Sequence, residues 1–258
     1  MLILIGLGLE TKDISIRGLQ TATEAKRVYI EQYTAFVSDE YIKYLKDSIG
    51  QEISQLDRSD LEENAKKTIS EAKKNDIAIL VPGDPLIATT HFATLINTAR
   101  KLGVKYKILH SSSIYSAAVG ESGLDIYKFG PPVTIAYWSD KYKPTSFLDL
   151  INQNCRHDHH TLVLLDLNQK EKRPMRLEEA VSLLRQAENE KLLDIITDDL
   201  KILVMGNVGK ENQQTAYVSI KDTAKVAKEF DGKMLVIIVP ATLNFAEEES
   251  ISRHLSQA

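Results

Sequence analysis

The sequence from residue 77 to residue 91, IAILVPGDPLIATTH, decides how the first half of this chain is expected to fold. Its five apolar residues 77–81 predict a buried strand, and a Gly83-Asp84-Pro85 turn follows the strand. Gly83 can adopt a positive φ without a steric penalty, and Pro85 restricts Asp84 to extended backbone. Because α/β proteins bind ligands beyond the carboxyl ends of their strands, this turn is a candidate site. The alternative is a purely structural turn in which Asp84 caps the next helix.

Strands and helices alternate along the rest of this half. Asp13 is placed to start one helix, Ser38 and Gly50 bound a second, and Ser59 with Glu62 has the pattern of a capping box. Strict alternation predicts a largely parallel sheet with helices on both faces. The predicted strands are 1–7, 28–33, 51–56, 77–81 and 106–110, and a helix is predicted from about 90 to 102 before Gly103.

The second half has a different pattern. A strong helix is predicted at 176–191, and the link through Gly209 is short enough for a hairpin, so antiparallel pairs are expected. The predicted strands are 133–138, 161–167, 202–205, 217–220 and 234–239. The fold class is therefore α/β, with an N-terminal α/β domain over 1–112 that has a mostly parallel sheet and a C-terminal α/β domain over 113–258 that has a mixed sheet.

Composition narrows the class of protein. The 258 residues carry a net charge of only -4, with 32 basic and 36 acidic side chains, so no broad field favours nucleic acid or an anionic membrane. Cys155 is the one cysteine, which fits a reducing compartment. The apolar start of the chain has the length of a strand rather than of a membrane span, and it lacks the pattern of a leader. A cytoplasmic protein is expected.

Several kinds of chemistry lack their sequence patterns. There is no Walker A sequence and no Gly-x-Ser-x-Gly elbow, which argues against nucleotide hydrolysis and against a serine hydrolase. The run Gly6-Leu7-Gly8-Leu9 has only part of a dinucleotide fingerprint. The cluster 157–160, His-Asp-His-His, lacks the spacing of a metal site on a helix, so a solvated loop is expected and no metal. The segment 123–130 is either a packed linker with Tyr127 and Phe129 as core anchors or part of a ligand site.

Four ordered motifs in the first half resemble one family. They are Gly6 to Leu9 with Asp13-Ile14-Ser15, then 28–34, then Gly83 to His91, and then Gly123 to Gly130. In this order they resemble the diphthine synthases of the tetrapyrrole methylase superfamily, and the resemblance weakens in the second half. It implies two α/β domains with S-adenosylmethionine in the cleft between them, and a homodimer. The implied reaction methylates the amino nitrogen of the 3-amino-3-carboxypropyl group on a histidine of translation elongation factor 2, giving diphthine.

The resemblance also implies a set of cofactor contacts. They are Leu9, Asp84, Ile87, Ser113, Ile114, Leu165, Met205 and Asn244. The chain departs from the family pattern at Gly206-Asn207, where alanine and arginine are usual, and at Asn244, where histidine is usual. No catalytic residue is assigned, although His91 and Asp84 are candidate proton acceptors. A cation for the substrate carboxylate is expected at Lys128 or Arg17.

Two other functions stay open at the level of sequence. One is methylation of a tetrapyrrole or of ribosomal RNA by a member of the same superfamily. The other is a non-catalytic regulator that binds S-adenosylmethionine without transferring its methyl group.

Overall fold

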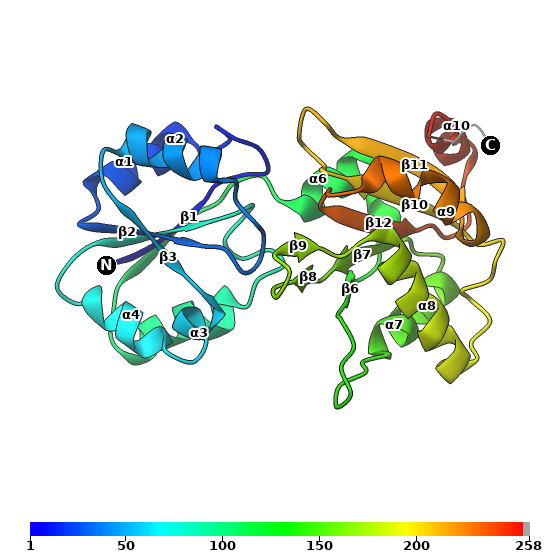
Figure 1. Ribbon diagram of the computed structural model, residues 1–258, viewed down its shortest axis with the longest axis horizontal. Coiled ribbons are helices and arrows are strands. Elements are labelled where there is room, and N and C mark those ends of the chain that lie inside the picture. The colour runs from blue at the N-terminus through cyan, green and yellow to red at the C-terminus, as the bar shows by residue number, and fades with distance from the viewer. Residues whose placement is uncertain (255–258) are drawn as a thin grey trace. The chain divides into compact units, whose positions relative to one another are not determined.

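The Gly-Asp-Pro turn lies at the carboxyl edge of a parallel sheet. The computed structural model describes residues 1–254, which form two units, Met1–Tyr115 and Ser116 onward (Figure 1). The expected domain boundary after residue 112 lies slightly before this division and stays a prediction.

All neighbouring strands in the sheet of the first unit are parallel, in the order β3-β2-β4-β1-β5. The expected parallel sheet is therefore confirmed. Strands β1 and β4 are buried along their whole length, as their unbroken apolar sequences require when helices cover both faces. The strands are β1 (Leu2–Gly6), β2 (Arg27–Glu31), β3 (Ile53–Leu56), β4 (Ile77–Val81) and β5 (Tyr106–Leu109).

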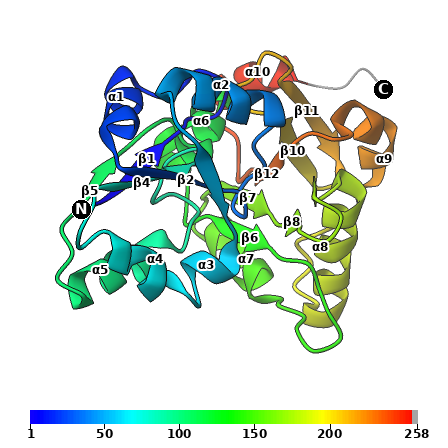
Figure 2. The same cartoon turned by 60° about the vertical axis from the view of Figure 1, so that its left-hand side comes forward.

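Helices lie on both faces of this sheet (Figures 1 and 2). Successive residues of β1 point to opposite faces of the sheet. Ile3 and Ile5 lie on the face that α1 and α2 cover, whereas Leu2 and Leu4 lie on the face that α3, α4 and α5 cover. The helices are α1 (Ile16–Glu24), α2 (Asp39–Ile49), α3 (Arg58–Leu61), α4 (Ala65–Glu71) and the π-helix η1 (Phe92–Ile96), which continues into α5 (Asn97–Lys101).

Two of the predicted helix starts are wrong. Ser15, not Asp13, caps α1, because the Asp13 carboxylate accepts hydrogen bonds from the main-chain N–H groups of the preceding loop, at Leu9 and Glu10. Asp57, not Ser59, begins α3, where it forms a reciprocal capping box with Asp60. At α1 the Asp13 carboxylate is used by the preceding loop and Ser15 caps the helix, whereas at α3 an aspartate two residues before Ser59 takes the cap position.

The other helix signals in this unit are confirmed. Ser38 caps α2 by accepting from Tyr41 N, and Gly50 ends it with a φ of 75°. The helix after the Gly-Asp-Pro turn ends before Gly103, whose φ is 66°. The sequence pattern did not reveal that the first part of this helix is a π-helix.

The second unit contains the expected mixed sheet, in the order β11-β10-β12-β7-β6. Strands β10 and β11 form the predicted antiparallel hairpin, β12 is antiparallel to both β10 and β7, and β6 is parallel to β7. The strands are β6 (Val133–Ile135), β7 (Thr161–Leu165), β10 (Lys201–Gly206), β11 (Gln214–Ser219) and β12 (Leu235–Val239), with a small ribbon of β8 (Leu167–Asn168) and β9 (Arg173–Pro174).

Helices α7 and α8 bury the main core of this unit against the sheet (Figure 1). The predicted helix at 176–191 is α8, and it begins at Leu177. No helix within residues 1–254 is long and apolar enough to cross a membrane. The helical segments are α6 (Ile114–Glu121), η2 (Ile126–Lys128), α7 (Ser146–Arg156), α8 (Leu177–Lys191), η3 (Ile220–Asp222), α9 (Thr223–Val226), η4 (Ala227–Phe230) and α10 (Phe245–Ser252).

Candidate cofactor site

The loops that follow β1 and β4 are joined by main-chain hydrogen bonds. Gly83 N donates to Gly8 O over 2.8 Å, and Gly8 N donates back to Gly83 O over 3.2 Å. Both glycines have positive φ, 77° at Gly8 and 68° at Gly83, which explains why the two glycine-rich motifs stand at these strand ends. The two motifs therefore form one structural feature at the carboxyl edge of the sheet.

Asp84 joins a third loop to this pair. Its Oδ2 accepts from the main-chain N–H of Ser111 at 3.2 Å and lies 2.8 Å from His110 Nδ1, directly after β5. Its Oδ1 accepts from Leu86 N at 2.9 Å, which folds the turn back on itself. Asp84 is only 6% exposed, so its carboxylate is committed to holding the loops after β4 and β5.

The same edge has space beside Gly83. A Cβ on Gly6 would collide with Gly83 O and Ser111 Cβ, whereas the only atom of the described chain within 4 Å of a Cβ on Gly83 is Ser112 O, at 3.9 Å. Ile87, in the same turn, leaves 41% of its surface exposed. The turn therefore has room at Gly83 and an exposed apolar side chain at Ile87, and contact of either with a cofactor stays a prediction.

The remaining expected contacts of the first unit follow β1 and β5. Leu9 is half-buried and its N–H donates to Asp13 Oδ2. Ser113 is buried, and half-buried Ile114 begins α6. The structure thus brings Leu9, Asp84, Ile87, Ser113 and Ile114 to one edge of one sheet, as parallel strand order requires.

In the second unit, Leu165 and Met205 lie at a common edge of the mixed sheet. Leu165 ends β7 and pairs with Ile135, and Met205 is the second-last residue of β10, which runs in the same direction as β7. The Met205 side chain is fully buried, and its backbone pairs with strands on both sides. Any contact from Met205 to a cofactor therefore stays a prediction.

Asn244 lies toward the opposite edge of this sheet. It caps α10 by accepting from Glu247 N at 3.0 Å, while Glu247 Oε2 accepts from Asn244 N at 2.8 Å. Nearby, Ala241 N donates to the ring of His160, at the start of β7. Asn244 is therefore separated from Leu165 by the length of β7, and its role as a cofactor contact also stays a prediction.

Glu247 is the centre of a buried polar network that sequence analysis missed. His160 Nε2 lies 2.9 Å from Glu247 Oε1, and Asp125 N donates to the same oxygen at 2.9 Å. Because His160 Nδ1 accepts from Ala241 N, the ring is neutral and carries its proton on Nε2. Burial lowers the pKa of His160, in agreement with a neutral ring. Burial alone would raise the pKa of Glu247, but hydrogen bonds from Asn244, Asp125 and His160 hold it at about 2.

The burial of His160 and the exposure of Tyr127 correct two expectations from the sequence. His160 is fully buried, so the cluster 157–160 is not wholly a solvated loop. Tyr127 is 92% exposed and is not a core anchor. Of the two candidate cations for the substrate carboxylate, Lys128 Nζ lies 3.4 Å from Glu247 Oε2 and 3.5 Å from Asp158 Oδ2, and Arg17 is exposed on α1. Within residues 1–254, no group of three or more histidine, cysteine, aspartate or glutamate side chains is placed to hold a metal ion.

A second buried pair lies beside the candidate site. His91 and Glu31 are both fully buried, with His91 Nε2 3.9 Å from Glu31 Oε1. Burial lowers the pKa of His91 to about 4 and raises the pKa of Glu31. Sequence analysis had offered His91 as a proton acceptor but gave Glu31 no role. The sequence signal that could have revealed Glu31 is its position, because it is a charged residue at the end of an apolar strand.

Comparisons with known proteins identify the family of this chain. Residues 1–224 match the family model described as Tetrapyrrole (Corrin/Porphyrin) Methylases. The chain is 37% identical over 254 residues to a diphthine synthase of Methanocaldococcus jannaschii, with 97% of each chain covered. It is 38% identical over 251 residues to one of Methanothermobacter thermautotrophicus, covering 96% of this chain and 93% of that one.

A solved structure extends the similarity to three dimensions. The crystal structure of a diphthine synthase superposes with a TM-score of 0.85 at 33% identity, covering 98% of this chain and 95% of the other. Similarity over nearly the whole length, in sequence and in fold, includes both units. The chain belongs to the tetrapyrrole methylase family and, within it, to the diphthine synthases.

Proposed function

We propose that this chain is an S-adenosylmethionine-dependent methyltransferase of diphthamide biosynthesis, with translation elongation factor 2 as its protein substrate. The observation that carries the proposal is full-length identity of 37% and 38% to two proteins named diphthine synthase. A tetrapyrrole or ribosomal RNA substrate is not favoured, because these relatives carry neither name. The acceptor would be the amino nitrogen of the 3-amino-3-carboxypropyl group on the modified histidine.

The local geometry supports binding of the cofactor at the carboxyl edge of the first sheet. Bound S-adenosylmethionine supplies an electrophilic methyl group. Gly83 leaves the space that the adenosine part needs, Ile87 offers an apolar surface, and Asp84 fixes the loop by accepting from Leu86 and Ser111. These residues bind and orient, which suits a transfer whose rate depends on placing the acceptor nitrogen in line with the methyl group.

The proposal also includes a cytoplasmic location, a homodimer and no nucleic acid partner. Elongation factor 2 acts in the cytoplasm, and the single cysteine, Cys155, fits a reducing compartment. A homodimer is proposed on the family resemblance, and sedimentation of the purified chain would give its mass. The mildly acidic balance of charges, -4 overall, gives no support for a nucleic acid partner.

The proposal is tested by binding and by transfer, measured separately. Calorimetry with S-adenosylmethionine is expected to show one saturable site per chain. Labelled methyl groups are then expected to pass to elongation factor 2 that carries the unmethylated side chain, and not to a factor whose modified histidine is replaced. Binding without transfer to an active factor would instead support a non-catalytic regulator, and the absence of both would overturn the proposal.

A further inference from the structure

Among residues 1–254, His91 is the one residue whose buried side-chain nitrogen or oxygen atoms lack a hydrogen-bond partner. Neither Nδ1 nor Nε2 has a hydrogen-bond partner among the residues that the structure describes, and the ring is fully buried. A buried polar atom without a partner carries a free-energy cost, so such an atom calls for an explanation. His91 ends the segment that begins at Gly83 and contains Asp84 and Ile87.

A partner for this ring stands just out of reach. Glu31 Oε1 lies 3.9 Å from His91 Nε2, about 1 Å beyond a good hydrogen bond. Glu31 is held in place, because its Oε2 accepts from the main-chain N–H groups of Tyr33 and Thr34 and its Oε1 accepts from the Thr34 hydroxyl. The carboxylate is therefore fixed, and a closing movement would have to come from His91.

The backbone on both sides of His91 has an uncommon conformation. Ala88, three residues before it, adopts a φ of 57°, which is unfavourable for a residue with a Cβ. The π-helix η1, Phe92–Ile96, begins directly after it, and π-helices are rare and frequent at functional sites. His91 thus lies between two backbone segments of the kind that cluster at functional sites.

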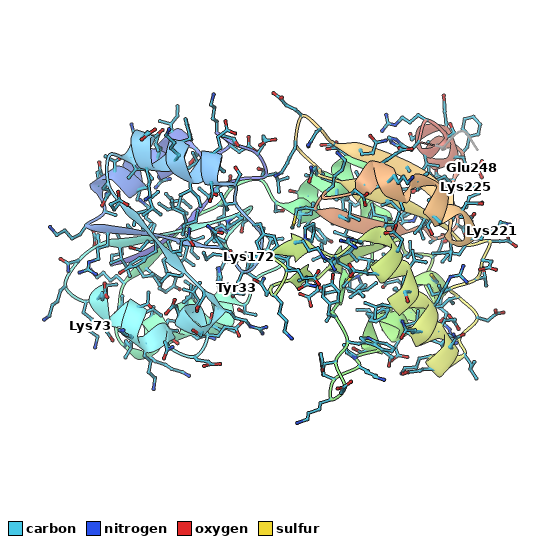
Figure 3. All side chains as sticks on the ribbon, viewed as in Figure 1. Tyr33, Lys73, Lys172, Lys221, Lys225 and Glu248 are labelled. Atoms are coloured by element: carbon cyan, nitrogen blue, oxygen red, sulfur yellow. The ribbon has the colours of Figure 1, made fainter. Side chains whose placement is uncertain are left out.

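The neighbouring contacts tie this movement to the loop after β2. Tyr33, labelled in Figure 3, packs its ring edge against His91 at 5.9 Å between centroids. The Tyr33 hydroxyl lies 2.9 Å from Thr90 Oγ1, which in turn donates to Glu62. Contacts of His91 and of its neighbour Thr90 therefore join the residues that follow two adjacent strands, β2 and β4.

We propose that His91 is a positioning residue, whose Nε2–H closes onto Glu31 Oε1 when the segment Gly83–Thr90 takes up its ligand. In this proposal the hydrogen bond forms together with ligand binding, so its free energy contributes to affinity. A ligand shifts such an equilibrium only through a difference in its interactions with the two arrangements, and this bond supplies one. The inference rests on the proposed function in one respect, namely that the ligand has the adenosyl group of S-adenosylmethionine.

The test compares binding with stability in His91→Phe, which keeps a buried ring beside Tyr33 but cannot donate. Calorimetry with S-adenosylhomocysteine is expected to show about tenfold weaker binding, equivalent to about 1.4 kcal/mol. The free energy of unfolding of the free protein is expected not to fall, because the proposed bond forms only with the ligand. His91→Gln, whose amide can donate to Glu31, is expected to recover part of the affinity.

A spectroscopic readout complements this comparison. Adding S-adenosylhomocysteine to the wild-type chain is expected to produce a slowly exchanging Nε2–H proton resonance from His91, and Glu31→Ala is expected to abolish it. If the wild-type chain does not bind S-adenosylhomocysteine, the proposed function has failed. If it binds, and His91→Phe binds equally well or loses stability in the free state, the proposed role of His91 is wrong.

Discussion

Asp84 Oδ2 accepts a hydrogen bond from the main-chain N–H of Ser111, 3.2 Å away, and this bond joins the turn after β4 to the chain after β5. The Asp84 carboxylate is nearly buried, and its other oxygen accepts from Leu86 within the turn. The aspartate of the Gly-Asp-Pro motif therefore acts as a clamp between two loops that carry expected cofactor contacts.

Asp84→Asn tests this clamp. An asparagine has one acceptor oxygen and presents an NH₂ group to one of the two N–H donors, so the loops lose a bond. We expect a loss of about 1 to 2 kcal/mol in the free energy of unfolding and about tenfold weaker binding of S-adenosylhomocysteine. Asp76→Asn is the control, because Asp76 is an exposed aspartate that pairs with the amino terminus. This substitution should change the affinity little. Equal affinities for the two variants would contradict the role of Asp84.

Gly8→Ala tests the close approach of the glycine loop to its neighbours. A Cβ at Gly8 would overlap Asp13 Cβ, whereas no atom of residues 1–254 lies within 4 Å of a Cβ at Gly50. The two glycines have nearly the same φ, 77° and 75°, so Gly50→Ala is a control for backbone strain alone. We expect Gly50→Ala to cost about 1 kcal/mol and Gly8→Ala about 2 kcal/mol more, measured by urea unfolding. Similar losses would mean that the loop at Gly8 relaxes freely.

Glu247→Ala tests the buried network of the second unit. The substitution removes the acceptor for His160, Asp125 N and Asn244 N, and it leaves Lys128 with one carboxylate fewer. We expect the free energy of unfolding to fall by about 3 kcal/mol, which denaturant titration would measure. Glu248→Ala, at the exposed neighbouring position labelled in Figure 3, should cost less than about 0.5 kcal/mol. A small loss for Glu247→Ala would show that the network adds little to stability.

The buried ring of His91 predicts a pH dependence of stability. Burial lowers its pKa from 6.5 to about 4, so between these values the unfolded chain binds a proton that the folded chain does not. The contribution of His91 to stability therefore rises with pH across this window, and acidification from pH 6.5 to pH 4 lowers this contribution by about 3 kcal/mol. The titratable groups of the described chain that face the ring are Glu31, Tyr33 and Glu62.

His91→Phe isolates this contribution, because Glu31 and Glu62 remain in both proteins. The difference in unfolding free energy between the wild-type chain and His91→Phe should shift against the wild type as pH falls. Urea unfolding at several pH values measures this difference. A difference that stays constant from pH 7 to pH 4 would mean that the folded ring binds a proton as readily as the unfolded one.

Local signals predicted much of the fold. Continuous apolar runs located β1 and β4, because strands buried on both faces leave no polar position. Ser38 and Gly50 gave both ends of α2, since their interactions involve only adjacent backbone. Asp13 and Ser59 were wrong predictions, because several residues that can cap a helix stand within two positions of each other and the linear pattern does not choose between them.

The side-chain pairs of the sites were not predictable in this way. His160 and Glu247 are 87 residues apart, and only the order of the strands brings them together. Glu31 and His91 meet because β2 and β4 are neighbours, a fact that alternation of elements does not give. The family resemblance supplied the list of expected contacts, but not the finding that Asn244 and Leu165 lie toward opposite edges of one sheet.

The most direct measurement is the mass of the modified-histidine peptide of elongation factor 2 after incubation with this chain and S-adenosylmethionine. We expect the mass to rise in steps of one methyl group, and fragmentation to place each step on the amino nitrogen of the 3-amino-3-carboxypropyl group. Asp84→Asn is expected to slow the rise. An unchanged peptide mass, with a factor that a known diphthine synthase methylates and with S-adenosylmethionine bound to this chain, would contradict the proposed function.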